Sequence, residues 1–376
     1  MPRTRHSRWT LPSIVASIGL AIALALFLLS CDSQDGDIPL NLGAQVQLIE
    51  SSGQVVVEDV SIDRRAILIR VAPEFSRDQC GRLLIVNFDG QIEVLADDVY
   101  MPFGGVTFNF AAFSPSGEEV AYVSNGCQLG PLSLRILSSG DGEPETLAGS
   151  VSVIRSWAEE TKIIFGRVGA GDNSVWEANP RTGDVAELTS DPVLAVSPDG
   201  STFVFLEDST GILNTGEMTS SFEGIPTGTD TDGSAFSPDG SEYVYLALLR
   251  SDQGFELAVV DLDSGTQKTI LPAAELNALL STFVVEWVPN GRSVLVQGGG
   301  DSTAYVIDTD SLEQTRLSLG IPASSMFWQG PLLVYGGGGD IWATILDYSG
   351  ERETDVRALS EQIRAGFPVP VDIGPD

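Results

Sequence analysis

SAFSPDGSEYVYL, residues 234–246, shows most clearly the pattern that determines the architecture of this chain. A small apolar segment is followed by a Ser-Pro-Asp-Gly turn, by two polar residues and then by alternating apolar residues. Proline and aspartate favour a tight turn, glycine accepts positive φ, and the alternation in Tyr243-Val244-Tyr245 is typical of a β-strand. The stretch therefore predicts two strands joined by a short turn.

The same pattern recurs along the chain. Clear copies are LAVSPDGSTFVFL at 194–206 and AAFSPSGEEVAYV at 111–123, and weaker copies lie at 59–69, 154–165, 285–296 and 325–335. The copies follow one another at roughly 40–50 residues, and each is followed by a second hairpin, such as LAVVDLDSGTQKTIL at 257–271. A period near forty built from short strands is typical of propellers. Because one four-stranded unit cannot bury both faces alone, we expect the copies to stack around a central axis.

The sequence thus predicts an all-β fold, a β-propeller of four-stranded antiparallel blades that spans residues 44–358. Seven blades are preferred, with six or eight as alternatives, because the hairpin at 44–60 resembles the last two strands of a blade. This hairpin would complete a blade that the C-terminal part of the chain begins. Residues 359–376 form a C-terminal tail, and we expect its proline-rich end, FPVPVDIGPD at 367–376, to be a loose arm.

The N-terminus predicts export. Arg3, Arg5 and Arg8 precede an uncharged, largely apolar stretch that ends in Leu-Leu-Ser-Cys at 28–31. A basic head, an apolar segment and a small residue before the cut are typical of a signal peptide, here residues 1–30. An uncleaved signal anchor is the alternative, since about twenty apolar residues can span a bilayer.

Leu-Leu-Ser-Cys also resembles the lipobox of bacterial lipoproteins, in which the cysteine is acylated and becomes the new N-terminus. This resemblance implies a lipid anchor, with palmitate-like acyl chains, on Cys31, followed by a polar linker over 31–43. It implies a location in a bacterial cell envelope, with the mature domain periplasmic or otherwise extracytoplasmic. Inner and outer membrane stay open.

The repeats resemble those of the TolB-type propeller over nearly the whole mature chain. The resemblance is specific for architecture and weak for function. TolB carries an α/β domain before its propeller, and the short linker after Cys31 leaves no room for such a domain. A role in the Tol-Pal system is therefore not implied.

Cys80 and Cys127 are the two cysteines that remain after lipidation of Cys31. Two spare cysteines in an exported chain predict a disulfide, with separate buried thiols as the alternative. Both precede the third strand of their repeats, so they are expected on the same rim of adjacent blades. Such a bond would contribute about 4 kcal/mol in the chain-entropy model.

The charge of the chain excludes some partners. Three of the 20 basic residues lie in the first thirty, so the rest of the chain carries 17 basic against 52 acidic residues, a formal charge of −35. Such a surface disfavours nucleic acid and anionic headgroups, which are bound through lysine and arginine. The one histidine, His6, lies in the predicted signal peptide, so a Ser-His-Asp triad and a histidine zinc site are excluded from the mature chain.

Several segments are candidate sites, and each has a simpler structural interpretation. The acidic turns at 229–234, 261–265 and 308–312 resemble calcium loops but lack full EF-hand spacing, and hairpin turns favour the same residues. The glycine runs at 298–300 and 336–339 lack the following helix or lysine of a phosphate loop. Trp157, Trp287 and Trp328 could line a binding face, but packing between blades is preferred. We assign no metal, cofactor or catalytic residue, and the ligand-binding residues stay unknown.

Two main functional hypotheses follow. The first is a non-catalytic, lipid-anchored scaffold that binds a protein, peptide or glycan of the envelope at one face of the ring. The second is a carbohydrate-active enzyme that uses two carboxylates in the central channel, which would require a pair of acids from different blades about 5–10 Å apart. An envelope structural component is a third possibility and would show a broad apolar patch on one rim. No nucleophile elbow is present, which disfavours a hydrolase of that type.

Overall fold

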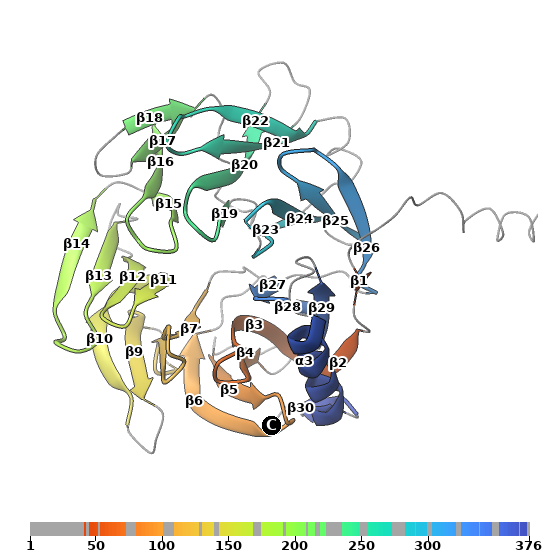
Figure 1. Ribbon diagram of the computed structural model, residues 1–376. Coiled ribbons are helices and arrows are strands. Elements are labelled where there is room, and N and C mark those ends of the chain that lie inside the picture. Colours follow the sequence, from red (N-terminus) through yellow and green to blue (C-terminus); the bar gives the residue numbers. More distant parts are fainter. Residues whose placement is uncertain are drawn as a thin grey trace, which may run out of the picture. The chain divides into compact units, whose positions relative to one another are not determined.

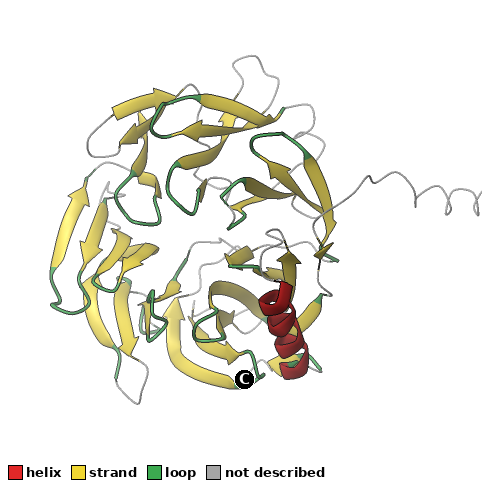
Figure 2. Cartoon of the chain, in the orientation of Figure 1, coloured by secondary structure: helices red, strands yellow, loops and turns green. Residues whose placement is uncertain are grey.

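A computed structural model of the chain shows the repeated hairpins as antiparallel sheets arranged in a ring (Figures 1 and 2). The structure describes residues 41–42, 45–51, 53–72, 80–100, 109–127, 130–138, 143–167, 174–190, 193–207, 210–214, 219–222, 235–248, 255–272, 283–289, 291–298, 303–320, 325–337, 339–347, 353–367 and 369–373. These residues all belong to one unit, Leu40–Asp376. The predicted signal peptide and Cys31 lie outside the described residues.

Four sheets each contain four strands that are consecutive in the chain. The first contains β11 (Val151–Glu159), β12 (Lys162–Arg167), β13 (Val175–Ala178) and β14 (Val185–Thr189). The second contains β15 (Val193–Val196), β16 (Phe203–Glu207), β17 (Thr210–Asn214) and β18 (Thr219–Phe222). The third contains β19 (Ala235–Phe236), β20 (Glu242–Leu248), β21 (Phe255–Asp261) and β22 (Gln267–Leu271). The fourth contains β23 (Phe283–Trp287), β24 (Ser293–Gly298), β25 (Thr303–Asp308) and β26 (Gln314–Ser318).

The eight-stranded sheet consists of two four-stranded halves. One half contains β3 (Gln54–Ser61), β4 (Ala66–Ala72), β5 (Cys80–Asn87) and β6 (Ile92–Tyr100). The other contains β7 (Ala111–Phe113), β8 (Glu119–Ser124), β9 (Ser133–Ser138) and β10 (Glu145–Gly149). The halves meet between β6 and β8 at one residue pair, Val99 and Ser124.

The last sheet joins the two ends of the described chain and is called the closing sheet below. It contains β27 (Ser325–Gln329), β28 (Leu332–Gly337), β29 (Asp340–Asp347), β2 (Val46–Ser51) and β30 (Val371–Ile373), and β1 (Asn41–Leu42) pairs with the end of β29. The N-terminal strand therefore completes the C-terminal sheet, as the hairpin at 44–60 suggested. Only β2 does so, however, because β3 turns away to begin the next sheet, so this hairpin is not the last two strands of one blade.

The first strands of the sheets form the inner wall of the ring. Moving around it, β3 contacts β7, and contacts continue through β11, β15, β19, β23 and β27, which again contacts β3. Where the structure describes them, the first-to-second and third-to-fourth strand turns lie together on one rim, which we call the turn rim. Backbone hydrogen bonds join such turns, for example from Leu262 N to Ser241 O at 2.9 Å. The ends of the second strands and the starts of the third strands lie on the opposite rim.

The turns on this rim explain why Ser-Pro-Asp-Gly recurs. Ser197 Oγ accepts a hydrogen bond from Thr202 N at 2.9 Å, and the Asp199 carboxylate accepts one from Ser201 N at 3.0 Å. Gly200 has a φ of 68°, which a glycine adopts without strain. The turn at 237–241 repeats the same bonds. The serine and aspartate side chains of the motif therefore satisfy backbone groups that the reversal would otherwise leave unpaired.

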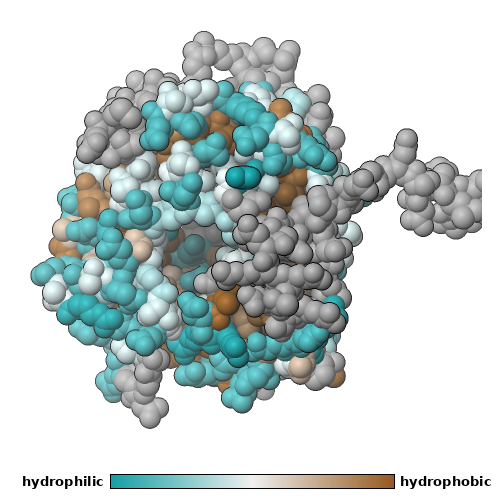
Figure 3. All heavy atoms as spheres, viewed as in Figure 1, coloured by the Kyte–Doolittle hydropathy of each residue, from teal (hydrophilic) through white to brown (hydrophobic). Residues whose placement is uncertain are grey.

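The hydrophobic core lies between neighbouring sheets. One cluster joins Val244 and Val259 of the third sheet to Val285 and Val294 of the fourth, and all four are buried. Because each sheet packs on both faces, its strands are apolar on both sides, and every residue of β4 is buried. Polar residues dominate much of the view of the surface in Figure 3.

The C-terminal segment packs on the ring instead of forming the expected loose arm. Helix α3 (Glu353–Gly366) follows β29, and buried Ile363 and Phe367 join a core cluster that contains Phe88 of the β5–β6 turn. β30 then pairs in parallel with β2, and Ile373 is buried. Apolar residues between the prolines of 367–376 therefore allow this segment to extend the closing sheet, which corrects the prediction for 367–373. Within the described ranges, no helix is long and apolar enough to cross a membrane.

Gly366 tests the packing of this segment. A Cβ on Gly366 would lie 1.9 Å from the carbonyl oxygen of Phe88, so Gly366→Ala must displace α3 or the β5–β6 turn. We expect a loss of roughly 2–3 kcal/mol in the free energy of unfolding, measured by urea denaturation. Gly149→Ala is the matched control, because a Cβ there meets nothing within 4 Å. Equal midpoints for the two variants would contradict tight docking of α3.

Candidate functional site

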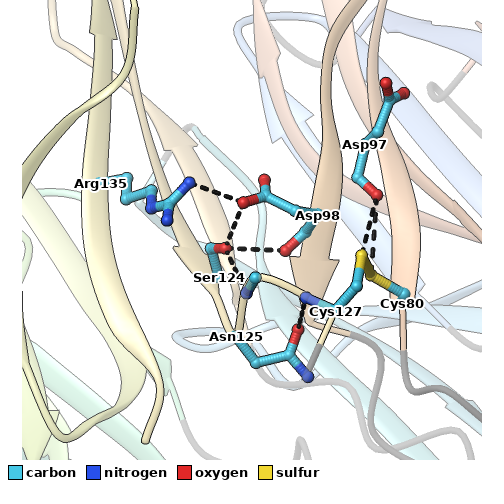
Figure 4. The surroundings of a disulfide bond; sticks show 8 residues. Cys80, Asp97, Asp98, Ser124, Asn125, Cys127 and Arg135 are labelled. Carbon is cyan, nitrogen blue, oxygen red and sulfur yellow. Dashed lines mark hydrogen bonds and ion pairs between the residues drawn. A yellow bond between two sulfur atoms is a disulfide. The ribbon is translucent and has the colours of Figure 1, made fainter. Parts of the chain in front are cut away.

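The Cys80–Cys127 disulfide ties the two halves of the eight-stranded sheet together (Figure 4). Cys80 begins β5 and Cys127 lies in the link between β8 and β9, with Cα atoms 5.2 Å apart. The two sulfur atoms lie 3.6 and 3.5 Å from the carbonyl oxygen of Asp97. The pairing and its place on one rim agree with the sequence, and separate buried thiols are not found. We call this rim the disulfide rim.

Polar side chains beside the disulfide add to this junction. Asp98 of β6 accepts a 2.6 Å hydrogen bond from Arg135 Nη1, and Ser124 Oγ lies 2.8 Å from its carboxylate. Cys127 has a φ of 56°, unusual for a residue other than glycine, and its N–H donates to Asn125 Oδ1 at 3.0 Å. Figure 4 shows these groups between the strands of the two halves. The junction is therefore held by a covalent bond and by charge-assisted hydrogen bonds.

A buried ion pair lies deeper in the same junction. Arg70 Nε of β4 lies 2.6 Å from Glu58 Oε1 of β3, and each side chain is 1% exposed. Glu58 Oε2 accepts hydrogen bonds from Phe110 N at 2.7 Å and from Ala111 N at 3.0 Å. Glu58 thus binds the backbone at the start of β7, in the neighbouring half of the sheet.

Arg70 extends the same network. Its Nη1 donates to the carbonyl of Tyr100 at 2.9 Å, and its guanidinium lies 4.7 Å from the ring centroid of Phe110. Arg70 therefore contacts both ends of the connection between β6 and β7. A cation over an aromatic face contributes most where water is excluded, as it is here.

Asp59 makes an equivalent contact one residue later. Its carboxylate accepts hydrogen bonds from Phe113 N at 2.8 Å and from Val60 N at 2.7 Å. A β-bulge between Val57 and Asp59 allows two consecutive acids of β3 to reach the neighbouring strand. Sequence reasoning missed this pair, although two acids inside the apolar run VVVEDVSI at 55–62 were a visible signal.

Burial changes the ionisation of both acids. Desolvation raises the pKa of Glu58, and Arg70 and the backbone hydrogen bonds oppose that rise. Desolvation also raises the pKa of half-buried Asp59 to about 6, with the neighbouring Glu58 charge adding to the rise and two backbone hydrogen bonds opposing it. Asp59 is therefore a group that can change protonation near neutral pH.

The cations of the turn rim hold adjacent sheets together. The chain has two lysines, and each donates to backbone carbonyls of a turn in the next sheet. Lys162 Nζ donates to Asp199 O at 3.3 Å and to Gly200 O at 3.2 Å. Lys268 Nζ donates to Thr309 O and, at 2.9 Å, to Asp310 O.

Two acids from different sheets share one arginine on the turn rim. Arg181 lies 3.3 Å from Glu119 and 3.5 Å from Glu160, which belong to neighbouring sheets. Glu160 also accepts a hydrogen bond from Ser116 N at 2.7 Å. Both carboxylates face the same cation, and Glu160 also binds backbone, so they stabilise the contact between sheets.

The other candidate segments take structural roles where they are described. In the turn at 308–312, Asp308 Oδ1 accepts hydrogen bonds from Asp310 N at 3.0 Å and from Ser311 N at 2.7 Å. Hydrogen bonds from Ser264 likewise lower the pKa of Asp261 in the turn at 261–265. Among the described residues, no group of three His, Cys, Asp or Glu could hold a metal. The turn at 229–234 lies outside the described residues.

The three candidate tryptophans and the described glycines of the two glycine runs also take structural positions. Trp157 and Trp287 are buried in clusters between sheets, and partly buried Trp328 packs against a third cluster, so packing accounts for all three. Gly298 ends β24, and Gly336 and Gly337 end β28, each before a second-to-third strand link. A Cβ on Gly339 would lie 2.5 Å from Ser51 O, so this position requires glycine.

Comparisons with known proteins identify the fold only. No family model and no curated protein matches the chain. An oligogalacturonate lyase from Vibrio parahaemolyticus is similar at a TM-score of 0.53 and 12% identity, with 84% of this chain and 100% of that chain covered. An oligogalacturonate lyase in complex with manganese has a TM-score of 0.53 and 14% identity, covering 84% of this chain and 99% of that chain. TolB from Acinetobacter baumannii has a TM-score of 0.44 and 16% identity, covering 82% and 71%.

Replacing Arg70 tests the buried ion pair. Arg70→Met leaves the Glu58 carboxylate buried without its cation, so we expect a loss of about 3–5 kcal/mol in the free energy of unfolding. Arg181→Met is the matched control and should cost less than about 1 kcal/mol, since Arg181 is 52% exposed. Adding Glu58→Gln to Arg70→Met should restore part of the loss. Similar losses for the two single variants would argue against an uncompensated buried charge.

The raised pKa of Asp59 predicts that the free energy of unfolding depends on pH. The folded protein keeps a proton on Asp59 up to pH about 6, whereas the unfolded chain releases it near pH 4. The folded state therefore binds more protons between these values, and the contribution of Asp59 falls by about 2 kcal/mol as pH rises from 4 to 6. Asp59→Asn lacks this decline, so its stability relative to the parent should increase across the window. Parallel urea-stability profiles for the two proteins would show that the carboxyl has an ordinary pKa.

Proposed function

We propose that the chain is a lipid-anchored, exported β-propeller that binds a protein, peptide or glycan of the cell envelope without catalysing a reaction. The lipid anchor is proposed on Cys31, where Leu-Leu-Ser-Cys ends the apolar stretch. The likeness to propeller structures with TM-scores of 0.53 supports the ring architecture. The proposal of binding without catalysis rests on the contacts that the charged side chains of the ring make with their neighbours.

We propose a count of seven blades. The two halves of the eight-stranded sheet count separately, because one residue pair joins them and each has its own inner strand, β3 or β7. The four four-stranded sheets and the closing sheet supply the others.

The hydrogen bonds that occupy the Glu58 and Asp59 carboxylates are the observation that carries the scaffold proposal. Glu58 binds Arg70 and two backbone N–H groups, and Asp59 binds two more. A general acid or base must reach a substrate proton, whereas these oxygens already hold neighbouring strands in place. Because these carboxylates are already occupied by neighbouring strands, they support the proposal of a rigid ring whose loops bind a partner.

An enzyme that uses paired carboxylates is the alternative, and the pKa of Asp59 favours it. A carboxyl with a pKa of about 6 beside a second carboxylate resembles an acid tuned for proton transfer. A lyase acting on oligogalacturonate is disfavoured, because that substrate is a polyanion and the mature chain carries a formal charge of −35. The described residues also do not fit the manganese of the similar lyase, since they form no group of three metal-binding side chains.

The scaffold proposal is tested by crosslinking and pull-down from envelopes. A carboxylate-directed carbodiimide suits this chain, because it has 52 acidic residues and two lysines that both bind backbone carbonyls. We expect a reproducible partner that is lost with the Cys31→Ala control. Recovery of bulk envelope protein alone would contradict an anchored scaffold.

The enzyme alternative has its own test. The purified chain is assayed on neutral and anionic glycans together with Asp59→Asn, a variant that keeps the size of the side chain. Turnover that falls by about 100-fold in the variant would support Asp59 as an acid or base. Absence of turnover in the parent protein, or full activity in the variant, would reject Asp59 in this role.

A further inference from the structure

Exposed large apolar side chains occur in three adjoining parts of the ring. In the part of the chain whose burial is described, the exposed large apolar residues are Ile92, Val94, Leu312 and Val369, which are 39%, 53%, 41% and 71% exposed. We call these four residues the apolar flank. They belong to the closing sheet region and to the two sheets that adjoin it, β3–β6 and β23–β26.

The chain arrives at the ring in the same region. β1 pairs with Leu346 and Asp347 at the end of β29, and nine residues separate Cys31 from Asn41. An extended chain of that length reaches about 35 Å at most. A lipid on Cys31 would therefore hold this sector of the ring near a bilayer surface.

Ile92 and Val94 lie on the same face of the β3–β6 sheet as two core residues, but they are exposed. They pair across β6 and β5 with Val86 and Leu84, and directly opposite residues share one face of a sheet. Val86 and Leu84 belong to the cluster that Ile363 and Phe367 cover. The outer part of this apolar face is thus left to solvent beside the end of α3.

Leu312 is exposed in a conformation that favours glycine. It ends the Asp-Thr-Asp-Ser-Leu turn with a φ of 62°, whereas Gly265 ends the equivalent Asp-Leu-Asp-Ser-Gly turn with a φ of 67°. The two turns share the bond from their last N–H to the first aspartate's carbonyl, each 2.9 Å. A leucine here is strained and exposed where glycine would fit without cost, which points to a functional reason for the side chain.

We propose that the apolar flank rests on the lipid bilayer to which Cys31 is anchored, so that the ring is held by its edge in a defined orientation. This inference rests on the proposed lipid anchor. Exposed aliphatic side chains beside a tether suit insertion at the boundary between headgroups and acyl chains. Because Asp310 and Glu313 lie next to Leu312 in the chain, Glu93 lies between Ile92 and Val94, and the mature chain is acidic, the contact favours zwitterionic over anionic lipid.

Fluorescence quenching in vesicles tests this orientation. The lipidated full chain with Val94→Cys is labelled with an environment-sensitive probe and reconstituted into phosphatidylcholine vesicles that contain a nitroxide lipid. The probe labels one thiol, because Cys80 and Cys127 form a disulfide and Cys31 is acylated. Glu187→Cys is the matched control, as it is the third residue of β14 just as Val94 is of β6, and it is exposed. We expect at least threefold stronger quenching at 94 than at 187, and equal quenching would overturn the proposal.

The variant Leu312→Gly distinguishes a loss of membrane contact from a loss of stability. The substitution relieves the strained φ, so the urea midpoint should stay equal or rise, whereas quenching at 94 should fall at least twofold. Replacing half of the phosphatidylcholine by phosphatidylglycerol should also reduce quenching at low salt, and added salt should restore it. Unchanged quenching in Leu312→Gly, or stronger quenching on the anionic vesicles, would contradict an apolar contact with lipid.

Two further measurements distinguish failure of this proposal from failure of the proposed lipid anchor and from self-association of the protein. Flotation of the protein with vesicles, absent in Cys31→Ala, reports the anchor by itself, so a protein that floats without quenching at 94 overturns the orientation alone. A protein that does not float overturns the anchor and, with it, this inference. A probe at 94 that responds to protein concentration without vesicles would show that a second copy covers the flank.

Discussion

Closure of the ring by β2 and β29 is the constraint on which the other sheets depend. Every sheet buries both faces against neighbours, so an open row would leave an apolar face exposed at each end. Pairing of Val46 with Ala343 brings together residues nearly three hundred positions apart, at a cost in chain entropy that grows only slowly with length. The cluster formed by the closing sheet, the β3–β6 sheet and α3 offsets that cost by burying both free faces.

The ties between neighbouring sheets are unequal. Most junctions combine apolar packing with a few bonds on the turn rim, such as those of Lys162 and Lys268. The junction between β3–β6 and β7–β10 adds a disulfide, the Asp98–Arg135 pair and the buried Glu58–Arg70 pair. This concentration holds β7, a strand of three residues, whose few backbone bonds are supplemented by the side chains of Glu58 and Asp59.

Much of the fold could be predicted from the sequence because the repeats encode local geometry. The Ser-Pro-Asp-Gly turns fix their own hydrogen bonds, and the alternating residues after them form second strands. The loss of register at Glu58 could not be foreseen, since a bulge depends on which backbone groups of the next sheet need partners. The docking of 367–373 was also missed, because prolines suggest an irregular arm, whereas Ile373 finds its cover only once β2 has joined β29. The disulfide followed from counting cysteines and repeats, while the exposure of Leu312 depends on a turn in which leucine stands where the equivalent turn has Gly265.

The position of β2 between two partners has a mechanical consequence. Antiparallel β29 bonds to one edge of β2 and parallel β30 to the other, and the chain leaves β2 through β1 toward its N-terminal end. A pull on the N-terminal end of β2 along its axis would load these backbone bonds together, in shear, instead of opening them one after another. The ring would then resist tension through the strand that also closes it.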